Sequence, residues 1–446
     1  SQGDLALLFT GQGSQYTDMG LDLAAAYPVV QETFDEADRI LEPALGRSIT
    51  SFIGVSEGED RDEKEAILKR TEYSQPATLT LDIAILRLLA SFGVHADMVA
   101  GHSLGEYGAA VAAGVMTFEE ALLAVTARGR EMANIHLEDP GKMAGIATRT
   151  EVVEEVLAEV PGYVVAANKN CPTQTVIAGA SDAVDEAVEM FRARGITVHP
   201  LPVSHAFHSK IVAPAAEPLR GVLAKMDLKA PARPFTTNVT GDWYPETQPA
   251  IVDLLAAQIW SPVEWVAQTE RMYEAGARVF VEVGPKRALA GFTVAILKRR
   301  PHRAHYTNHP KRGGVRSFRD ALAGLVAAGF PIRSAPGSFD IFADPAPRLA
   351  STEAIANASE PTSPAVAPAV AEDVGQAILQ IVANSTGYDT DELDLDYELE
   401  ADLGIDTVKQ AEVFSQIRDT FQIPEDPDFD PTNHKTLRSL IDWAGA

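Results

Sequence analysis

The sequence predicts an α/β core, interrupted by a small ferredoxin-like α+β subdomain and followed by an all-α helical bundle. Three observations support this. Short apolar runs that end at glycine turns alternate with helical stretches over residues 1–335. The order within about residues 141–203 is strand, helix, strand, strand, helix, strand. After a Pro/Ala-rich linker at 336–371, residues 372–446 hold three amphipathic helical stretches.

Two buried strands of the core are predicted directly ahead of glycine turns. Leu5–Thr10 is apolar and runs into Gly11–Gly13, and Met98–Ala100 runs into Gly101–Gly105. Apolar spacing and a capping pattern at Thr117 predict helices around these turns. The remaining core elements are helices at 77–92 and 106–113, a further helix that starts at the Thr117 cap and reaches 132, and a strand at 279–283.

The subdomain and the C-terminal bundle are predicted from the same periodicities. In the subdomain we expect strands at 143–147, 163–168, 175–178 and 197–202, with helices at 150–159 and 183–194. In the bundle we expect helices at 374–386, 408–420 and 437–444.

Length, charge and cysteine usage narrow the class of protein. A chain of 446 residues predicts two or three domains, and its formal charge of -26 argues against nucleic acid or an anionic membrane as a partner. Residues 372–446 hold 18 acids and 4 bases, which indicates either a solubilising surface or an acidic domain that docks on basic patches. With Cys171 alone, no membrane-length apolar run and no secretion signal, we expect a cytoplasmic protein.

Ser103 is the candidate nucleophile. It stands in Gly101–Gly105 (GHSLG), between a predicted strand and an Ala-rich predicted helix. This is the pattern of a nucleophile elbow, whose tight turn lifts a serine hydroxyl above the strand end, although so short a match also fits an ordinary loop. A serine needs a base, and His102, His205 and His208 are the candidates.

Six short motifs in order point to a family. They are GQGSQ at 11–15, QPA at 75–77, GHSLGE at 101–106, RGR at 128–130, HAFH at 205–208 and VGP at 283–285. Over roughly residues 4–332 the chain resembles the acyltransferase domains of polyketide synthases and the bacterial malonyl-CoA:carrier-protein transacylases. The resemblance implies an α/β-hydrolase-like acyltransferase core.

The resemblance also assigns catalytic roles. Ser103 would be the nucleophile and His208 its base, and the backbone carbonyl of Gln258 would orient that base. The backbone N–H groups of Gln12 and Leu104 would form the oxyanion hole, where negative charge develops.

Arg128 would hold the free carboxylate of a malonyl group, because the planar guanidinium matches a carboxylate. The alternative is a helix-surface arginine paired with an acid such as Glu131. In the HAFH motif, Phe207 would fill the space of an α-methyl group, which favours malonyl over methylmalonyl. The other implied pocket residues are Gln75, Asn170, His205 and His102, the last of these behind the nucleophile.

The implied reaction moves an acyl group from malonyl-CoA, or a related thioester, through Ser103 to the phosphopantetheine thiol of a carrier. It needs no cofactor, and no metal-ligand spacing or dinucleotide fingerprint occurs in the sequence. The implied partners are an acyl carrier domain and neighbouring synthase domains such as a ketosynthase. Two alternatives stay open: a hydrolase that releases the acyl group to water, and a non-catalytic docking unit.

The bundle at 372–446 resembles acyl carrier domains of polyunsaturated-fatty-acid and iterative polyketide synthases, most closely at 399–410 (LEADLGIDTVKQ). Where those carriers have the attachment serine, this chain has Thr407. Its β-methyl crowds the hydroxyl. Three interpretations remain: Thr407 is still modified with phosphopantetheine, the domain is a degenerate carrier used for docking, or the residue was introduced to block modification. An unrelated helical bundle is a fourth.

Overall fold

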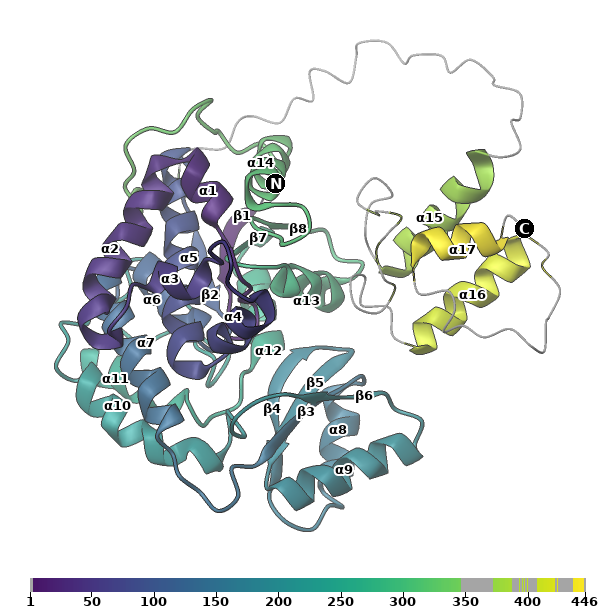
Figure 1. Cartoon of the computed structure of the whole chain (residues 1–446), viewed down its shortest axis with the longest axis horizontal. Helices are drawn as coiled ribbons and strands as arrows, with labels where there is room; N and C mark the ends of the chain where they lie inside the picture. The colour runs from purple at the N-terminus through teal and green to yellow at the C-terminus, as the bar shows by residue number, and fades with distance from the viewer. Residues whose placement is uncertain are drawn as a thin grey trace. The chain divides into compact units, whose positions relative to one another are not determined.

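The computed structural model describes residues 3–345, 372–386, 393, 395, 397, 399, 407–421, 423 and 436–444. The chain divides into two compact units, Ser1–Thr352 and Glu353–Ala446 (Figure 1). The first unit is mixed α/β and the second is helical. Most of the predicted linker, at 346–371, lies outside the described residues.

A parallel sheet forms the centre of the first unit. Its strand order is β2-β1-β7-β8. Apolar side chains fill β1, β2 and β7 because helices cover both faces of a parallel sheet. The strands are β1 (Asp4–Phe9), β2 (Met98–Gly101), β7 (Ala277–Val283) and β8 (Arg303–Tyr306).

The carboxyl ends of three strands lie level with one another. In the register of this sheet, Phe9 pairs with Gly101 on one side and with Val283 on the other. The segments that follow the three strands therefore emerge at one edge of the sheet. Ligands of open parallel sheets bind at this edge, and all three segments carry motifs singled out in the sequence.

Helices pack around the sheet, and two of them are buried almost along their whole length, α5 (Thr71–Ser91) and α6 (Gly105–Ala112). Apart from two helices on the second sheet described below, the others in this unit are α1 (Leu21–Ala26), α2 (Pro28–Leu45), α3 (Ile49–Ile53), α4 (Arg61–Leu68), α7 (Phe118–Ala133), the 3-10 helix η1 (Lys210–Ala215), α10 (Ala216–Leu223), α11 (Gln248–Ala257), α12 (Trp265–Glu274), α13 (Ala288–Leu297) and α14 (Gly314–Ala327).

A second, antiparallel sheet is inserted between α7 and η1. Its strand order is β4-β5-β3-β6, and α8 and α9 pack on it around a separate apolar cluster (Figure 1). Every element lies where the sequence predicts one, although β4 extends three residues beyond the predicted strand. The elements are β3 (Lys142–Ile146), α8 (Thr150–Leu157), β4 (Val164–Cys171), β5 (Gln174–Gly179), α9 (Ser181–Ala193) and β6 (Val198–Leu201).

The second unit contains three described helices at the predicted positions. They share an apolar core that includes Ile378, Phe414 and Leu437. The helices are α15 (Glu372–Thr386), α16 (Thr407–Phe421) and α17 (Leu437–Ala444). Thr407 is the first residue of α16, and residues 400–406 before it lie outside the described part of the chain.

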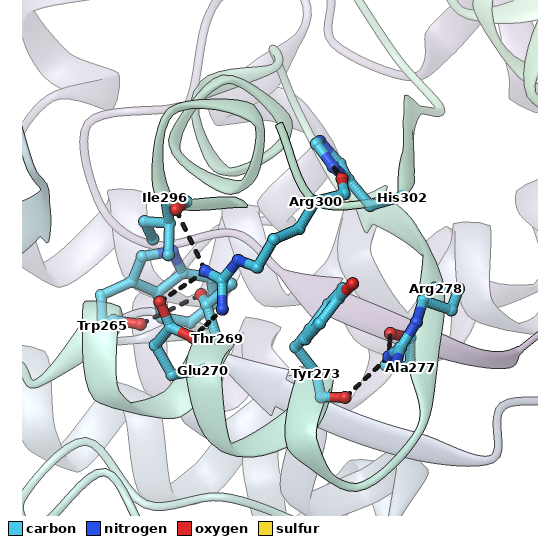
Figure 2. A network of polar contacts seen from close by, with 9 residues as sticks. All are labelled: Trp265, Thr269, Glu270, Tyr273, Ala277, Arg278, Ile296, Arg300 and His302. Carbon is cyan, nitrogen blue, oxygen red and sulfur yellow. Dashed lines mark hydrogen bonds and ion pairs between the residues drawn. The ribbon is translucent and has the colours of Figure 1, made fainter. Parts of the chain in front are cut away.

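A polar network fixes α12 against the end of α13 (Figure 2). Two guanidinium nitrogens of Arg300 bind the two carboxylate oxygens of Glu270 at 2.5 and 2.6 Å. The guanidiniums of Arg300 and Arg278 lie 4.8 and 3.8 Å from the centroid of the Tyr273 ring. The network anchors the helix that carries Trp265, a fully buried residue whose ring contacts His102 beside Ser103.

Two predictions of local structure were incomplete. Helix α5 begins at Thr71, six residues before the predicted helix, so that Gln75 lies inside the helix. Pro76 within its second turn removes one backbone N–H, yet the helix continues through it. The short edge strand β8, half-exposed and partly polar, had no pattern that distinguished it from a loop. Among the described residues, no helix is long and apolar enough to cross a bilayer.

Candidate active site

Ser103 lies at the turn between β2 and α6, in left-handed backbone with a φ of 52°. The two glycines of the motif act by lacking a Cβ. A Cβ on Gly101 would lie 2.0 Å from the carbonyl carbon of Gly105, and one on Gly105 would lie 2.1 Å from the Phe9 carbonyl oxygen. The turn can therefore fold tightly against the end of β1 only with glycine at both positions.

His208 meets Ser103 across 105 residues of sequence, with its Nε2 2.7 Å from the serine Oγ. It follows β6 and also has left-handed backbone, with a φ of 56°. Its Nδ1 lies 3.0 Å from the Ser261 carbonyl and 3.2 Å from the Gln258 carbonyl. Because carbonyls only accept, Nδ1 carries the proton and Nε2 accepts from the serine hydroxyl. Two carbonyls, rather than the one predicted at Gln258, thus orient the ring.

The imidazole of His208 is held in its neutral form. Burial, together with the nearby charge of Arg128 and the ring of His102, lowers the pKa of His208 to about 3. At neutral pH the ring is therefore free to accept a proton.

The turn after β1 lies against the serine turn. A Cβ on Gly11 would lie 2.5 Å from the His102 carbonyl oxygen, so glycine there permits the close approach. Within the described residues, neither the Gln12 nor the Leu104 backbone N–H has a protein acceptor. The Ser103 N–H, in contrast, is bound to the side chain of Asn238.

Arg128 extends from α7 and is only 1% exposed. One nitrogen, Nη2, donates to Gln258 Oε1 at 3.1 Å, and Nε has no partner among the described residues. No described carboxylate forms an ion pair with it, so a surface pairing with Glu131 is wrong. Burial lowers the pKa of Arg128, because an unpaired guanidinium is costly to remove from water. The structure thus buries a cation beside the Ser–His pair with no described carboxylate in ion-pair contact, although the buried Glu106 acts on it at longer range.

The other predicted pocket residues form separate groups. Gln75 is fully buried, and its Nε2 lies 3.5 Å from Gln12 Oε1. His102 Nε2 lies 2.8 Å from Asn170 Oδ1, which joins the elbow to the end of β4. These contacts bring the two turns, α5 and the small sheet together around Ser103.

The remaining two residues of the HAFH motif differ in their surroundings. His205 Nε2 lies 3.0 Å from the Ile135 carbonyl oxygen, a contact that ties its loop to the segment after α7. The Phe207 ring is 8% exposed, belongs to the main apolar core and lies 6.3 Å from the His205 ring, centroid to centroid.

Asn238, for which no role was predicted, holds both sides of the elbow. Its Oδ1 accepts from the Ser103 N–H and its Nδ2 donates to the Gly101 carbonyl, both at 2.7 Å. Its own N–H donates to Glu106, which also accepts from the Tyr244 hydroxyl. Glu106 was quoted only as part of its motif, and burial raises the pKa of this carboxyl to about 7. No spacing or composition marks Asn238, 135 residues beyond Ser103.

This arrangement can carry out one kind of chemistry. A serine hydroxyl, a neutral imidazole and two unoccupied N–H donors suit attack on an acyl carbon. A buried guanidinium suits an acyl group with its own carboxylate. Within the described residues no group of three or more His, Cys, Asp or Glu is placed to hold a metal ion.

Comparisons with known proteins were made for the whole chain. A family model described as acyl transferase domain matches residues 6–310, and one described as phosphopantetheine attachment site matches 376–444. Malonyl CoA-acyl carrier protein transacylase of Bacillus subtilis is 37% identical over 300 residues, covering 66% of this chain and 91% of the relative. Spectinabilin polyketide synthase system protein NorB of Streptomyces orinoci is 35% identical, covering 68% of this chain and 14% of that protein.

Solved structures give the same result. The acyltransferase domain from the second module of the salinomycin polyketide synthase is 32% identical, with a TM-score of 0.67, covering 74% of this chain and 75% of that one. A type II polyketide synthase malonyl-transacylase, solved in complex with its acyl-carrier protein, is 34% identical, with a TM-score of 0.64, covering 72% of this chain and 99% of that one.

Proposed function

Because the chain belongs to the acyl transferase domain family over residues 6–310 and has a phosphopantetheine-attachment segment behind it, we propose that Ser103 transfers a malonyl group from CoA to a carrier. The observation that carries the substrate class is Arg128, a cation 1% exposed beside Ser103 with no described carboxylate partner. The names of the relatives, malonyl CoA-acyl carrier protein transacylases among them, support the same substrate.

The reaction takes place in two half-steps. Ser103 Oγ attacks the thioester carbonyl carbon while His208 Nε2 takes its proton, and the N–H groups of Gln12 and Leu104 stabilise the oxyanion. The C–S bond then breaks, and His208 returns the proton to the departing CoA sulfur. In the second half, a carrier thiol gives its proton to His208 and attacks the ester, and the Ser103 hydroxyl re-forms.

Phe207 supports malonyl over methylmalonyl. Its ring lies in the packed core, 8% exposed, so it cannot easily yield the volume of an extra methyl group. A packing difference of one methyl is worth about 1–3 kcal/mol, or tenfold to two-hundredfold in rate. We therefore expect a preference of this size rather than an absolute selection.

Radiolabelled malonyl-CoA tests the proposal directly. The expected result is a stable label on Ser103 that is transferred to an added phosphopantetheine carrier. Competition with unlabelled malonyl-CoA should lower this label strongly, whereas competition with methylmalonyl-CoA should lower it far less. Ser103→Ala is the control and takes up no label. Release of the label as free acid faster than to the carrier would support the hydrolase alternative. The absence of any label on the chain without substitutions would support a docking role.

Charge supports an acidic carrier as the acceptor. Residues 286–319 contain ten Lys or Arg and no Asp or Glu, in a chain of net charge -26. Arg300 is engaged with Glu270, but Lys298, Arg299 and Arg303 are exposed and have no partner within the described residues. The carrier-type segment of this chain has nine acids and no base over residues 389–406. Carriers of this charge type would be steered toward such a surface.

Thr407 makes this chain's own carrier segment a poor acceptor. Its β-branched side chain restricts the rotamers of the hydroxyl that a phosphopantetheinyl transferase must reach. Of the interpretations stated above, we propose a degenerate carrier retained for docking. The acyl group on Ser103 then passes to a carrier elsewhere.

Intact mass after co-expression with a phosphopantetheinyl transferase tests this assignment. The wild-type chain is expected to show no mass gain, whereas Thr407→Ser is expected to gain one phosphopantetheine, which also shows that the fold of the tail is recognised. A gain on the unaltered chain, mapped to Thr407, would establish a working carrier instead.

Three finer assignments complete the proposal. The strand orders support an α/β-hydrolase-like core with a ferredoxin-like insertion. A cytoplasmic location is supported by the single, unpaired Cys171. A neighbouring ketosynthase is supported by the likeness to polyketide synthases, of which this chain matches only a part.

A further inference from the structure

Gln258 contacts all three residues to which the proposed function gives the main roles. It caps the end of α11 and is fully buried. Its Oε1 accepts from Arg128 Nη2 at 3.1 Å, and its Nε2 donates to the backbone carbonyl of Ser103. Its own backbone carbonyl lies 3.2 Å from His208 Nδ1. The sequence predicted only the last of these contacts.

The orientation of the Gln258 amide follows from its neighbours. A guanidinium can only donate hydrogen bonds and a peptide carbonyl can only accept them. The amide oxygen must therefore face Arg128 and the amide nitrogen must face Ser103. Only a side chain with both an acceptor and a donor at its end can join these two groups. Glutamate in its ionised form cannot donate, and methionine, of similar length, cannot donate and accepts only weakly.

The carbonyl that Gln258 holds belongs to a backbone in an unfavourable conformation. Ser103 has a φ of 52°, which L-residues avoid unless surrounding contacts enforce it. Asn238 fixes its N–H and Gln258 fixes its C=O, so two side-chain amides hold the serine from both sides. Of the two, only Gln258 also contacts Arg128.

We propose that the Gln258 side chain is a positioning residue that couples a carboxylate bound at Arg128 to the placement of Ser103. An arriving carboxylate binds the unpaired N–H groups of Arg128 and fixes the guanidinium. The guanidinium fixes the Gln258 amide, and the amide fixes the serine backbone. A carboxylated acyl group is thus selected in the rate of acylation as well as in binding. This inference rests on the proposed function.

Single-turnover acylation of Ser103 by malonyl-CoA and by acetyl-CoA, followed by quenched intact mass, tests the coupling. Gln258→Met removes the side-chain contacts to Arg128 and Ser103, together with that to Glu106, and leaves the backbone carbonyl for His208. We expect its maximal rate with malonyl-CoA to fall about tenfold to a hundredfold, with a half-saturating concentration changed little. The rate with acetyl-CoA, which has no carboxylate to bind Arg128, should fall by a smaller factor, because this substrate loses only the support of the Ser103 carbonyl.

A double-mutant cycle with Arg128→Ala distinguishes coupling from structural support. In the Arg128→Ala background, Gln258→Met should have little further effect on malonyl loading. Equal losses with malonyl-CoA and acetyl-CoA, or additive losses in the cycle, would overturn the coupling. If Gln258→Met does not fold, Gln258→Leu provides the same measurement, because it also lacks the contacts to Arg128 and Ser103 and introduces no charge beside Arg128.

The failure of the coupling and the failure of the proposed function give different results. Full malonyl loading by Arg128→Ala alone would refute the carboxylate site and with it the proposed substrate. Loss of loading in Arg128→Ala, combined with an unchanged malonyl-to-acetyl ratio in Gln258→Met, would refute only the coupling.

Discussion

Replacing His208 with alanine is expected to slow the acylation of Ser103 by malonyl-CoA on the order of 10³-fold. The imidazole Nε2 lies 2.7 Å from the serine Oγ, and no other described side chain hydrogen-bonds that oxygen. Without the base, the serine hydroxyl must lose its proton to water, which is slow because the pKa of an alcohol lies far above neutral pH. Rapid-quench intact mass measures the rate of acyl-enzyme formation directly.

His199→Ala is the matched control, because this exposed histidine on β6 lies away from the contacts of Ser103. It should acylate at the wild-type rate. A His208→Ala protein that melts as the wild type does and still acylates within tenfold of it would contradict the role of His208.

The depressed pKa of His208 also predicts how acylation depends on pH. Its pKa of about 3 keeps the ring neutral from pH 8 down to pH 5, whereas an exposed histidine would be protonated below about 6.5. The Glu106 carboxyl, with a pKa near 7, titrates within the same range, so the profile is best recorded in Glu106→Gln. A flat profile is expected there, and an inflection near pH 6.5 would argue against a buried neutral base.

The same pKa difference has a consequence for stability. In the unfolded chain His208 takes up a proton as the pH falls below about 6.5, whereas in the folded chain it does so only near pH 3. Between these values the unfolded state binds more protons. The free energy of unfolding therefore decreases as the pH falls through this window.

Replacing Arg128 with alanine is expected to lower kcat/KM for malonyl-CoA about a hundredfold, as the loss of a charge-assisted pair worth up to about 3 kcal/mol implies. Acetyl-CoA, which offers no carboxylate, should be loaded as well as before or better. The buried guanidinium, 1% exposed and with no described carboxylate in ion-pair contact, gives the physical reason. Competition between the two thioesters, read as the mass of the acyl-enzyme, measures the change in preference.

Two variants check this interpretation of Arg128. Arg130→Ala removes an exposed arginine from the same helix and should leave the preference unchanged. Arg128→Lys keeps the charge but loses the planar fork, so it should recover only part of the malonyl activity. An unchanged preference for malonyl in Arg128→Ala would exclude a carboxylate contact there.

Local sequence patterns predicted most of the helices and strands of the fold. The apolar runs before Gly11 and Gly101 predicted β1 and β2, and the cap at Thr117 predicted the start of α7, where the structure has a capping box. Strand β8 was missed because its four residues, one exposed and three half-buried, carry too little periodicity. Its place is determined by pairing with β7, a contact that the local sequence does not record.

The residues of the candidate site also divide into those that local motifs predicted and those that only distant contacts reveal. Ser103, His208 and Arg128 lie in short motifs, so their residue types and order could be read before their geometry was known. Asn238 and the side chain of Gln258 could not, because their importance comes from contacts with residues 135 and 155 positions away. The contact between the Ser261 carbonyl and His208 could not be predicted either, because a backbone group makes it and the residue type gives no sign of it.

The left-handed backbone at both Ser103 and His208 sets selection for stability against selection for catalysis. Each such residue costs the fold about 1–2 kcal/mol that glycine would not incur. A search that scored only resistance to heat would therefore favour glycine at both positions and discard the chemistry. Laboratory evolution of a more heat-stable variant therefore needs a catalytic screen at every round, because glycine at these two positions would relieve the backbone and remove the nucleophile or its base.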